Sequence, residues 1–473
     1  METVYKGYTP TIGIEVHAEL RTKTKMFCDS KNEPHAREAN THVCPICMGH
    51  PGTLPVVNRE AVKHVLRVGV AVGGELATYT EFDRKNYFYP DIPKGYQISQ
   101  YAYPLVKGGE LAQVKLTRVH LEEDTARSQH DRGEGSLIDY NRAGVPLMEL
   151  VTEPVIHDAK TAGNFARELQ ILLRTLGAST AHMEKGEMRV EANISVSKTD
   201  TFGTKVEVKN LNSFKSVESA IEYEIKRQVE LLETGGKVTQ ETRGWDENKN
   251  RTFAQRLKES ADDYRYFPDP DIPKFSIELS EEISSITIVS SMPELPSEKR
   301  LKYDNLGIPR EQVESIIFNP GFDAFFSEFV GATDNAKIIK LGANYLTSDV
   351  ASLLTSERSI TTASVRSFLL LMSCVDEGIL NSRVAKDILS EVIFEHKNPK
   401  ELASSRGLIQ ESDGDALMVL IEQIVSENVG IVTEYKQGKE SVMHYLVGQG
   451  MKLSRGTANP ELLKKLLIEK ITL

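Results

Sequence analysis

Cysteine is scarce in this sequence, with four residues among 473, and tryptophan occurs once. So few cysteines do not suggest a disulfide framework, which favours a reducing compartment, and we expect the cytoplasm. Long apolar runs are also absent, since none approaches the roughly 20 residues that a membrane span needs. The first residues, METVYK, lack the layout of a signal peptide. The sequence therefore predicts no membrane partner.

The chain also lacks an overall excess of positive charge. Its 57 Lys and Arg residues stand against 68 Asp and Glu residues, which gives a formal net charge of −11. This balance argues against a protein that coats nucleic acids non-specifically. It leaves room for an RNA partner that binds one local basic patch.

Motifs of several common enzyme classes are missing. The P-loop pattern G-x-x-x-x-G-K-[S/T] does not occur, because GGKV (235–238) lacks both the spacing and the hydroxyl. The G-x-S-x-G turn of hydrolases and a Gly/Ser-rich amidase-like stretch are absent too. If this chain activates a carboxylate with ATP, it does so on a sheet, with a metal ion and basic side chains.

The length predicts roughly two to four domains. Residues 1–292 are rich in predicted strands, with two helices among them. The segment SMPELP (291–296) is typical of a linker, because two close prolines favour extended backbone. Beyond it we predict a helical domain over 293–346 and an all-α tail domain over 347–473.

Capping residues mark three of the predicted helices. Asp158 is a good N-cap for the first of them. The second follows Ser216 and stops at the glycines 235–236. The last helix opens with Asn459 as its N-cap and Pro460 at its first position.

Acidic and imidazole side chains occur in a segment that otherwise has the pattern of a strand. In IGIEVH (12–17), aliphatic residues alternate with Gly13, Glu15 and His17. A period of two predicts that Glu15 and His17 lie on one face of a strand and the aliphatic residues on the other.

Two further segments repeat this pattern. Arg118, His120, Glu122 and Asp124 share one parity of a second predicted strand, and Glu149 interrupts the apolar stretch PLMELV. Carboxylates with a histidine on one face of a sheet can hold a hard divalent cation, which in turn can hold a nucleoside triphosphate. The alternative for each acid is a solvated polar face.

Three of the four cysteines have the spacing of a small zinc site. Cys44 and Cys47 form a C-x-x-C pair, Cys28 lies upstream, and we describe the loop 28–47 as zinc-knuckle-like. The candidates for a fourth ligand are Asp29, His35, His42 and water. The alternative is a thioredoxin-like redox pair, which is disfavoured because no βα pattern follows Cys47. We expect a structural zinc ion that fixes this loop.

Basic residues gather in three segments and in the C-terminal tail. The segments are FDRKNYFYPD (82–91), KNLNSFK (209–215), and the region from RLKE to DDYRYFPDPD (256–271). The second precedes a predicted helix, whose N-terminus favours an anion. From residue 435 onward the tail holds seven Lys and Arg residues against three Glu, as an RNA-binding surface needs. The alternative in each case is a solvated surface.

These segments, taken as strings, closely resemble the family formed by the B subunits of bacterial-type aspartyl/glutamyl-tRNA amidotransferases. The resemblance runs nearly end to end. The motifs that carry it are GIEVH (13–17), FDRKNYFYPD (82–91), YQISQ (96–100), HLEED (120–124), KNLNSF (209–214), DDYRYFP (262–268), LVGQ (446–449) and ANP (458–460).

The resemblance implies an α+β fold, in which an antiparallel β-sheet cradle is followed by a helical domain and a helical tail that grips tRNA. It implies a ligase that uses ATP and Mg²⁺ to phosphorylate the side-chain carboxylate of Glu on the glutamine tRNA or Asp on the asparagine tRNA. Ammonia then displaces the phosphate. A separate amidase (glutaminase) subunit supplies the ammonia from glutamine, and a small third subunit completes a heterotrimer.

The resemblance also implies roles for individual residues. Glu15, His17, Glu123 and Glu149 match the family's metal-site positions, and they are the expected catalytic residues. Simple alternation with His120 favours Glu122 over Glu123 instead, and the sequence leaves this choice open. Lys85 and Glu123 are expected where the ammonia path meets the kinase site. Asn210, Arg256 and Arg265 are expected to contact the nucleotide or the substrate. Lys452, Arg455, Lys464 and Lys465 are expected to bind tRNA.

The chain departs from the family pattern at one place. Family members with zinc often carry a C-x-C pair where this chain has Cys28 followed by Asp29 and Ser30, so one expected ligand is missing. The large insertion of archaeal relatives finds no room in 473 residues, which favours the bacterial type. A non-catalytic tRNA-binding or assembly factor on the same scaffold is the alternative function. The sequence does not choose between the two tRNA substrates.

Overall fold

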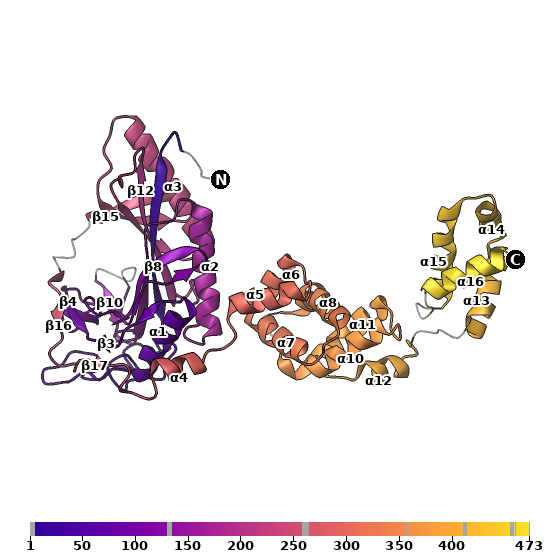
Figure 1. Ribbon diagram of the computed structural model, residues 1–473, viewed down its shortest axis with the longest axis horizontal. Helices are drawn as coiled ribbons and strands as arrows, with labels where there is room; N and C mark the ends of the chain where they lie inside the picture. The colour runs from indigo at the N-terminus through magenta and orange to yellow at the C-terminus, as the bar shows by residue number, and fades with distance from the viewer. Residues whose placement is uncertain are drawn as a thin grey trace. The chain divides into compact units, whose positions relative to one another are not determined.

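The structure is a computed structural model that describes residues 5–129, 135–257, 264–355, 358–409, 414–454, 458 and 460–472. The side chains of residues 256, 257 and 414–416 lie outside this description. The chain divides into two compact units, Met1–Pro296 and Ser297–Leu473, with the division at the end of the predicted linker (Figure 1).

The first unit holds the strands of the described chain and four of its helices. Its strands are β1 (Thr9–Glu19), β2 (Glu75–Leu76), β3 (Tyr79–Thr80), β4 (Asp83–Asn86), β5 (Tyr96–Ser99), β6 (Val106–Lys107), β7 (Glu110–Leu111), β8 (Val114–Glu123), β9 (Arg127–Gln129), β10 (Leu137–Asp139), β11 (Pro146–Thr152), β12 (Met188–Ser197), β13 (Val206–Leu211), β14 (Glu241–Asp246), β15 (Arg251–Leu257), β16 (Phe267–Pro268) and β17 (Phe275–Ser276). Its helices are α1 (Arg59–Ala71), α2 (Ala159–Thr175), α3 (Phe214–Glu233) and α4 (Ser285–Ser290).

A ten-stranded mixed sheet organises the described part of this unit. Its order is β15-β14-β13-β12-β1-β11-β8-β6-β2, and β7 pairs with β8. Neighbouring strands are antiparallel except β13 and β14, which are parallel. The predicted α+β class with a sheet domain before a helical region is confirmed, and the single parallel pair makes the sheet mixed.

The alternating pattern of β1 determines which face of the sheet is covered. Ile12, Ile14 and Val16 are fully buried and belong to the main hydrophobic core. Helices α2 and α3 pack on this side of the sheet, as Figure 1 shows. Burying a side chain of this size contributes roughly 1.5–3 kcal/mol, so the apolar face is fixed and the polar parity of β1 must face the other way.

The two long helices begin at polar caps. The Asp158 carboxylate accepts a hydrogen bond from the Thr161 amide at 2.8 Å, which confirms the predicted cap of α2. The predicted start of α3 after Ser216 is wrong. The cap is Ser213, whose hydroxyl accepts from the Ser216 amide at 3.0 Å, so the helix begins at Phe214.

Three smaller sheets complete the described part of the unit. Strands β16, β4 and β5 form one of them, and β17 with β3 and β10 with β9 form two-stranded pairs. Strand β5 also lies against β8, where the Ile98 amide donates to Glu123 Oε1 at 3.0 Å. The segment of the predicted motif 82–91 is thereby held beside the large sheet.

The second unit is helical. Its elements are α5 (Pro296–Asn305), α6 (Arg310–Phe318), α7 (Pro320–Gly331), α8 (Ala336–Tyr345), the π-helix Leu346–Val350, α9 (Ala351–Leu353), the 3₁₀-helix Thr362–Ser364, α10 (Val365–Asp376), α11 (Ser382–Phe394), α12 (Pro399–Ser405), α13 (Gly414–Glu427), α14 (Val429–Lys436), the 3₁₀-helix Glu440–Val442, α15 (Met443–Leu453) and α16 (Pro460–Thr472).

Helices α13 to α16 share a small core of their own around Ile421, Leu446 and Leu463. Asn459, the predicted cap of α16, lies outside the described residues. The predicted domain boundary at residue 346 falls where α8 continues directly into the π-helix. Within the described chain, every helix is too short or too polar to cross a bilayer.

Candidate active site on the open face of the sheet

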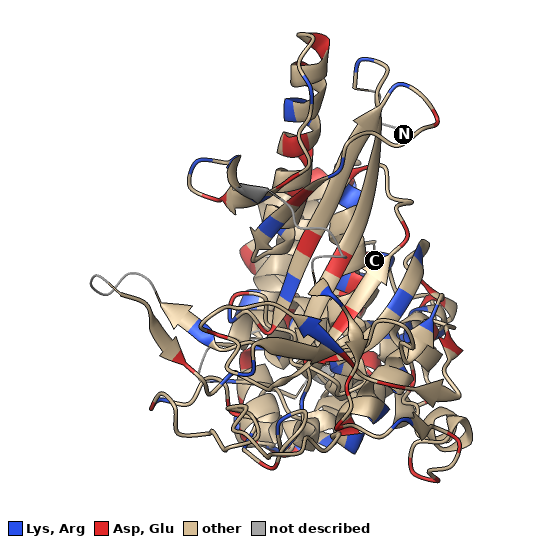
Figure 2. Cartoon of the chain, turned by 90° about the vertical axis from the view of Figure 1, so that its left-hand side faces the viewer, with Lys and Arg blue, Asp and Glu red and all other residues tan. Residues whose placement is uncertain are grey.

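Three neighbouring strands bring histidine and carboxylate side chains to one place. In the register of the sheet, His17 on β1 pairs with Glu149 on β11, and Glu149 pairs with His120 on β8. Figure 2 shows acidic positions side by side on the long strands of this sheet, with basic positions beside them. Adjacent strands lie about 4.8 Å apart, so paired side chains on one face are within reach of a common ion.

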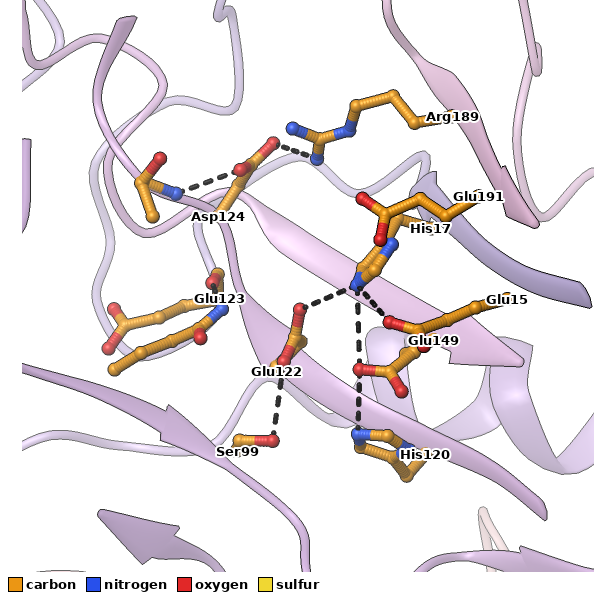
Figure 3. A network of polar contacts seen from close by, with 12 residues as sticks. Glu15, His17, Ser99, His120, Glu122, Glu123, Asp124, Glu149, Arg189 and Glu191 are labelled. Atoms are coloured by element: carbon orange, nitrogen blue, oxygen red, sulfur yellow. Dashed lines mark hydrogen bonds and ion pairs between the residues drawn. The ribbon is translucent and has the colours of Figure 1, made fainter. Parts of the chain in front are cut away.

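The distances define a compact group, which we call the carboxylate cluster: Glu15, His17, His120, Glu122 and Glu149. His17 Nε2 lies 3.4 Å from Glu149 Oε2, 3.5 Å from Glu122 Oε1 and 3.9 Å from Glu15 Oε1. His120 Nε2 lies 3.4 Å from Glu149 Oε2. Figure 3 shows these side chains converging from separate strands. The ligand atoms of Glu15, His17 and Glu149 lie within 4.8 Å of one another, as do those of His120, Glu122 and Glu149.

Burial shifts the pKa values of the side chains in this cluster. Burial and the neighbouring Glu149 carboxylate raise the pKa of Glu15 to about 7, and the same causes raise the pKa of Glu122. Burial favours neutral His17, but its contact with Glu149 and the charges of Glu149 and Glu122 raise its pKa to about 9. Carboxylates that repel one another at a shared site fit a hard divalent cation, which removes that repulsion.

A lysine faces the same cluster from the small sheet. Burial opposes the charged form of Lys85 on β4, yet the carboxylates of Glu122 and Glu149 raise its pKa well above the usual range. Its Nζ lies 5.0 Å from the centre of the Tyr264 ring. Lys85 therefore keeps its charge beside the cluster, where it can neutralise a further anion.

The structure places Glu123 apart from the carboxylate cluster, which corrects the prediction that it joins Glu15, His17 and Glu149. Strand β8 pairs regularly with β11 at Glu122 and Glu123, so adjacent side chains point to opposite faces. Figure 3 shows Glu122 turned toward His17 and Glu123 turned away.

On its own face, Glu123 is bound by other groups. Lys94 Nζ donates to Glu123 Oε2 at 2.6 Å, and the Ile98 amide donates to Oε1 at 3.0 Å. The pair borders a cavity whose lining includes Cys47, Lys94, Glu123 and Gly144. The buried charge of Glu123 is thus compensated by Lys94 and by a backbone donor.

Two of the three predicted nucleotide or substrate residues have exposed side chains outside the cluster. Asn210 is exposed with φ +66° at an irregularity of the β12–β13 pairing. The side chain of Arg256 lies outside the described residues. Arg265 is exposed with φ +47°, and its carbonyl accepts from Asn86 Nδ2 at 2.8 Å.

An open cavity lies beside β1, and its lining ends one residue before Glu15 of the cluster. Its lining includes Thr11, Gly13, Asn193, Ser195 and Phe202. Gly13 shares its parity with Glu15 and His17, and two residues of strand separate it from Glu15 by roughly 7 Å. Because Gly13 carries no side chain, the cavity stays open next to the carboxylates.

The three cysteines of the loop 28–47 form a second candidate metal centre. Their Sγ atoms lie within 4.8 Å of one another, and Cys28 and Cys47 are buried. Lys25, fully buried, has its Nζ 3.9 Å from Cys47 Sγ. Three thiolates around Zn²⁺ carry one net negative charge, which a lysine ammonium compensates, so the donor set fits a zinc ion.

The predicted protein candidates for a fourth zinc ligand have other surroundings. His42 Nε2 lies 3.2 Å from Glu33, and His35 Nδ1 lies 2.9 Å from Arg127 Nη2. Asp29 is exposed. The group of ligand atoms within 4.8 Å of one another contains the three cysteines and none of these three residues.

In the tail, Lys452 on α15 and Lys464 and Lys465 on α16 are exposed, as a phosphate-binding role requires. None of the three forms an ion pair with a residue of the described chain. Lys470, by contrast, is paired with Glu422 at 2.8 Å. Arg455 lies outside the described residues.

Several residues that shape the site received no role from the sequence. His120 contacts Glu149, and the parity that His120 shares with Glu122 in the sequence could have predicted its place in the cluster. Ser99, whose hydroxyl donates to Glu122 Oε2 at 3.3 Å, and Lys94 had no such signal, because they reach β8 from a segment distant in sequence.

Comparison with known proteins identifies the family of the chain. A family model described as the GatB/GatE catalytic domain matches residues 10–283, and one described as the GatB domain matches residues 324–471. The B subunit of the aspartyl/glutamyl-tRNA(Asn/Gln) amidotransferase from Thermus thermophilus is 43% identical over 477 residues, which cover 98% of this chain and 99% of the relative. The same protein from Gloeothece citriformis is 40% identical over 490 residues, 98% of each chain, and that from Caldicellulosiruptor saccharolyticus 40% over 484 residues, 98% and 99%. The chain therefore belongs to the family of aspartyl/glutamyl-tRNA amidotransferase B subunits.

Proposed function

We propose that this chain is the ligase component of a tRNA-dependent amidotransferase. It would use ATP to phosphorylate the side-chain carboxylate of Glu on tRNA(Gln), of Asp on tRNA(Asn), or of both. A carboxylate oxygen bonds to the γ-phosphorus as the bond to ADP breaks, and ammonia then attacks the acyl carbon as phosphate leaves. The products would be Gln-tRNA(Gln) and Asn-tRNA(Asn). Relatives that share nearly the whole chain carry the amidotransferase activity in their names.

The observation that carries the proposal is the carboxylate cluster. Glu15, His17, Glu122 and Glu149, with His120, would hold Mg²⁺, and the ion would neutralise charge on the phosphates of ATP. A buried group of acids costs free energy unless a partner compensates it. A factor that only binds tRNA would have no need for this cost, which argues against the alternative of a non-catalytic scaffold.

Lys85 would provide the second positive charge at the reacting phosphate. Phosphoryl transfer is catalysed mainly by positioning and by stabilising charge on the phosphoryl oxygens. Lys85 remains protonated beside Glu122 and Glu149, so its ammonium group can hold the γ-phosphate. The cavity at Gly13 would take the remainder of the nucleotide, because Gly13 lies on the same strand face as Glu15, two residues along β1.

Glu123 and Lys94 would border the route by which ammonia arrives. They line a cavity on the opposite face of β8 from the cluster. A polar passage suits ammonia better than an apolar one, since ammonia accepts and donates hydrogen bonds. Ammonia would come from a glutaminase (amidase) partner, and a small third subunit would complete the heterotrimer in the cytoplasm.

The tail and the cysteine site would have supporting roles. Lys452, Lys464 and Lys465 would contact tRNA phosphates, as exposed lysines on helices do. Zn²⁺ bound by Cys28, Cys44 and Cys47 would fix the loop 28–47.

The test is reconstitution of the full chain with its glutaminase partner. Each mischarged tRNA is offered with ATP, Mg²⁺ and glutamine, and the amide on the tRNA is measured. We expect ATP-dependent amide formation with at least one of the two tRNAs. Binding of both tRNAs without ATP turnover would support the non-catalytic alternative instead.

A further inference from the structure

Five tyrosine rings from three separate segments form a continuous row, which we call the tyrosine ladder. Tyr101 stacks on Tyr266, with ring centres 4.3 Å apart and planes 10° from parallel. The row continues from Tyr266 to Tyr264 at 6.1 Å, to Tyr87 at 5.9 Å and to Tyr89 at 6.1 Å, each contact edge to face. The rings at the two ends are the exposed ones: Tyr101 is 52% and Tyr89 51% exposed.

The polar residues of β4 hold the ladder together. The buried Asp83 carboxylate accepts from the Tyr101 amide at 2.9 Å. Asn86 Nδ2 donates to the carbonyls of Tyr264 at 3.2 Å and Arg265 at 2.8 Å. The motif 82–91 thus does more than place Lys85, because it fixes the backbone on both sides of the tyrosine row.

The ladder adjoins the carboxylate cluster. Lys85 lies over the Tyr264 ring and faces Glu122. Ser99, two residues before Tyr101, contacts Glu122 at 3.3 Å. Burial and the nearby charges of Glu122 and Glu149, opposed by Lys85, raise the pKa of Tyr266 to about 12. The middle of the row therefore lies beside Lys85 and the carboxylate cluster, and both of its ends reach the surface.

We propose that the tyrosine ladder stacks on the unpaired 3′-terminal nucleotides of the aminoacylated tRNA. This inference rests on the proposed function and adds the residues that position its substrate. Single-stranded RNA ends are bound by stacking of their bases on aromatic side chains. The exposed rings Tyr101 and Tyr89 offer stacking surfaces for bases of an unpaired strand, whereas the single adenine of ATP needs one enclosed pocket. An RNA end that follows the row delivers its amino acid to the carboxylate cluster.

Binding measurements with two forms of one tRNA test the proposal. The full chain, assembled with its glutaminase partner, is titrated with intact tRNA and with tRNA that lacks its two 3′-terminal nucleotides. We expect Tyr101→Ala to weaken binding of the intact tRNA about tenfold, within the range for one stacked base, and to leave binding of the truncated tRNA unchanged. Tyr101→Trp, which keeps a stacking ring, should restore binding.

Tyr103→Ala is the matched control. Tyr103 is 45% exposed and packs against Tyr79 at 5.2 Å, outside the ladder, so both tRNA forms should bind this variant like wild type. Tyr89→Ala, at the other end of the row, gives an independent arm if Tyr101→Ala is unstable. It should also weaken only the intact tRNA.

Four results would overturn the proposal. Both variants could bind both tRNA forms like wild type, or lose affinity for both forms equally. The variants could lose affinity for ATP with tRNA binding intact, which would assign the row to the nucleotide base. They could lose the glutaminase partner, which would make the row a protein interface. Failure of wild type to form any amide would contradict the proposed function alone, because tRNA binding is measured without catalysis.

Discussion

The two faces of strand β8 hold adjacent carboxylates in opposite ways. On one face Glu122 has His17 at 3.5 Å and a serine hydroxyl, and it shares its surroundings with two further acids. On the other face Glu123 has a lysine and a backbone amide of its own. Glu122 lies where a further cation would be stabilised, whereas the charge of Glu123 is already compensated. Charge compensation therefore separates a candidate metal ligand from a carboxylate that is already paired more clearly than sequence adjacency does.

The largest expected effect comes from the face that holds Glu122. Glu122→Gln removes a charged ligand without changing size, and Glu149→Gln does the same at the centre of the cluster. We expect either variant to lower ATP-dependent amide formation by at least about 10²-fold, because charge stabilisation at the phosphate is lost. The measurement is the rate of amide formation and of phosphate release.

Glu153→Gln is the control for these variants. Glu153 follows β11 and accepts a hydrogen bond from Thr117 at 2.7 Å outside the cluster, so its loss should leave the rate nearly unchanged. Wild-type rates in the Glu122 and Glu149 variants would exclude the cluster as the site of phosphoryl transfer.

The opposite face should respond differently. Glu123→Gln removes the charge that pairs with Lys94 but leaves the carboxylate cluster intact. We expect phosphate release to stay within a few-fold of wild type, while amide formation from glutamine falls roughly tenfold or more. Amide formation from added ammonium salt, which bypasses the partner, should be affected less.

If Glu123→Gln abolished phosphate release as Glu122→Gln is expected to, the two faces of β8 would not have different functions. A thermal unfolding measurement accompanies this variant, since removing one partner of a buried ion pair can cost about 3–5 kcal/mol. An unchanged melting temperature with lost glutamine-dependent activity would favour the ammonia route.

The site illustrates what strand periodicity can and cannot predict. The alternation of IGIEVH put Glu15 and His17 on one face, and alternation with His120 favoured Glu122, as the structure places them. Family resemblance favoured Glu123, which a regular strand turns away. Resemblance transfers a position's importance but not the direction of its side chain.

Contacts between distant segments were beyond the sequence. Lys94 reaches Glu123 and Tyr101 stacks on Tyr266 only because small sheets bring separate loops together. The start of α3 was missed for a local reason. Ser213 and Ser216 are both good caps, and only the backbone shows that the first one accepts the hydrogen bond.

A smaller effect is expected from a change at Gly13, which lies on β1 on the same face of the sheet as the carboxylate cluster. Gly13→Leu places a side chain in the open cavity, and an added Cβ there meets its nearest atom at 3.9 Å, an ordinary van der Waals distance. We expect the affinity for ATP to fall about tenfold, equivalent to roughly 1.4 kcal/mol, by calorimetry with a non-hydrolysable analogue.

Gly135→Leu provides the comparison for this variant. An added Cβ at Gly135 also meets open space, and Gly135 lies away from the cavity lining. Its affinity for ATP should match that of wild type. Equal affinity in Gly13→Leu would remove this cavity from the nucleotide site.

The smallest effect on catalysis should come from the cysteine site, which borders the Glu123 face through Cys47. Cys47→Ser removes one of three thiols, so bound zinc should fall from about one ion per chain toward none, by elemental analysis. Loss of the ion loosens the loop 28–47 and should lower the melting temperature by a few degrees. The Cys374→Ser variant, whose change lies in the buried core of α10, should retain zinc in the loop 28–47.

Because the carboxylate cluster lies on the other face of β8, phosphate release should change less in Cys47→Ser than glutamine-dependent amide formation does. Equal loss of both would mean that the metal in the loop supports the whole sheet and not one of its faces.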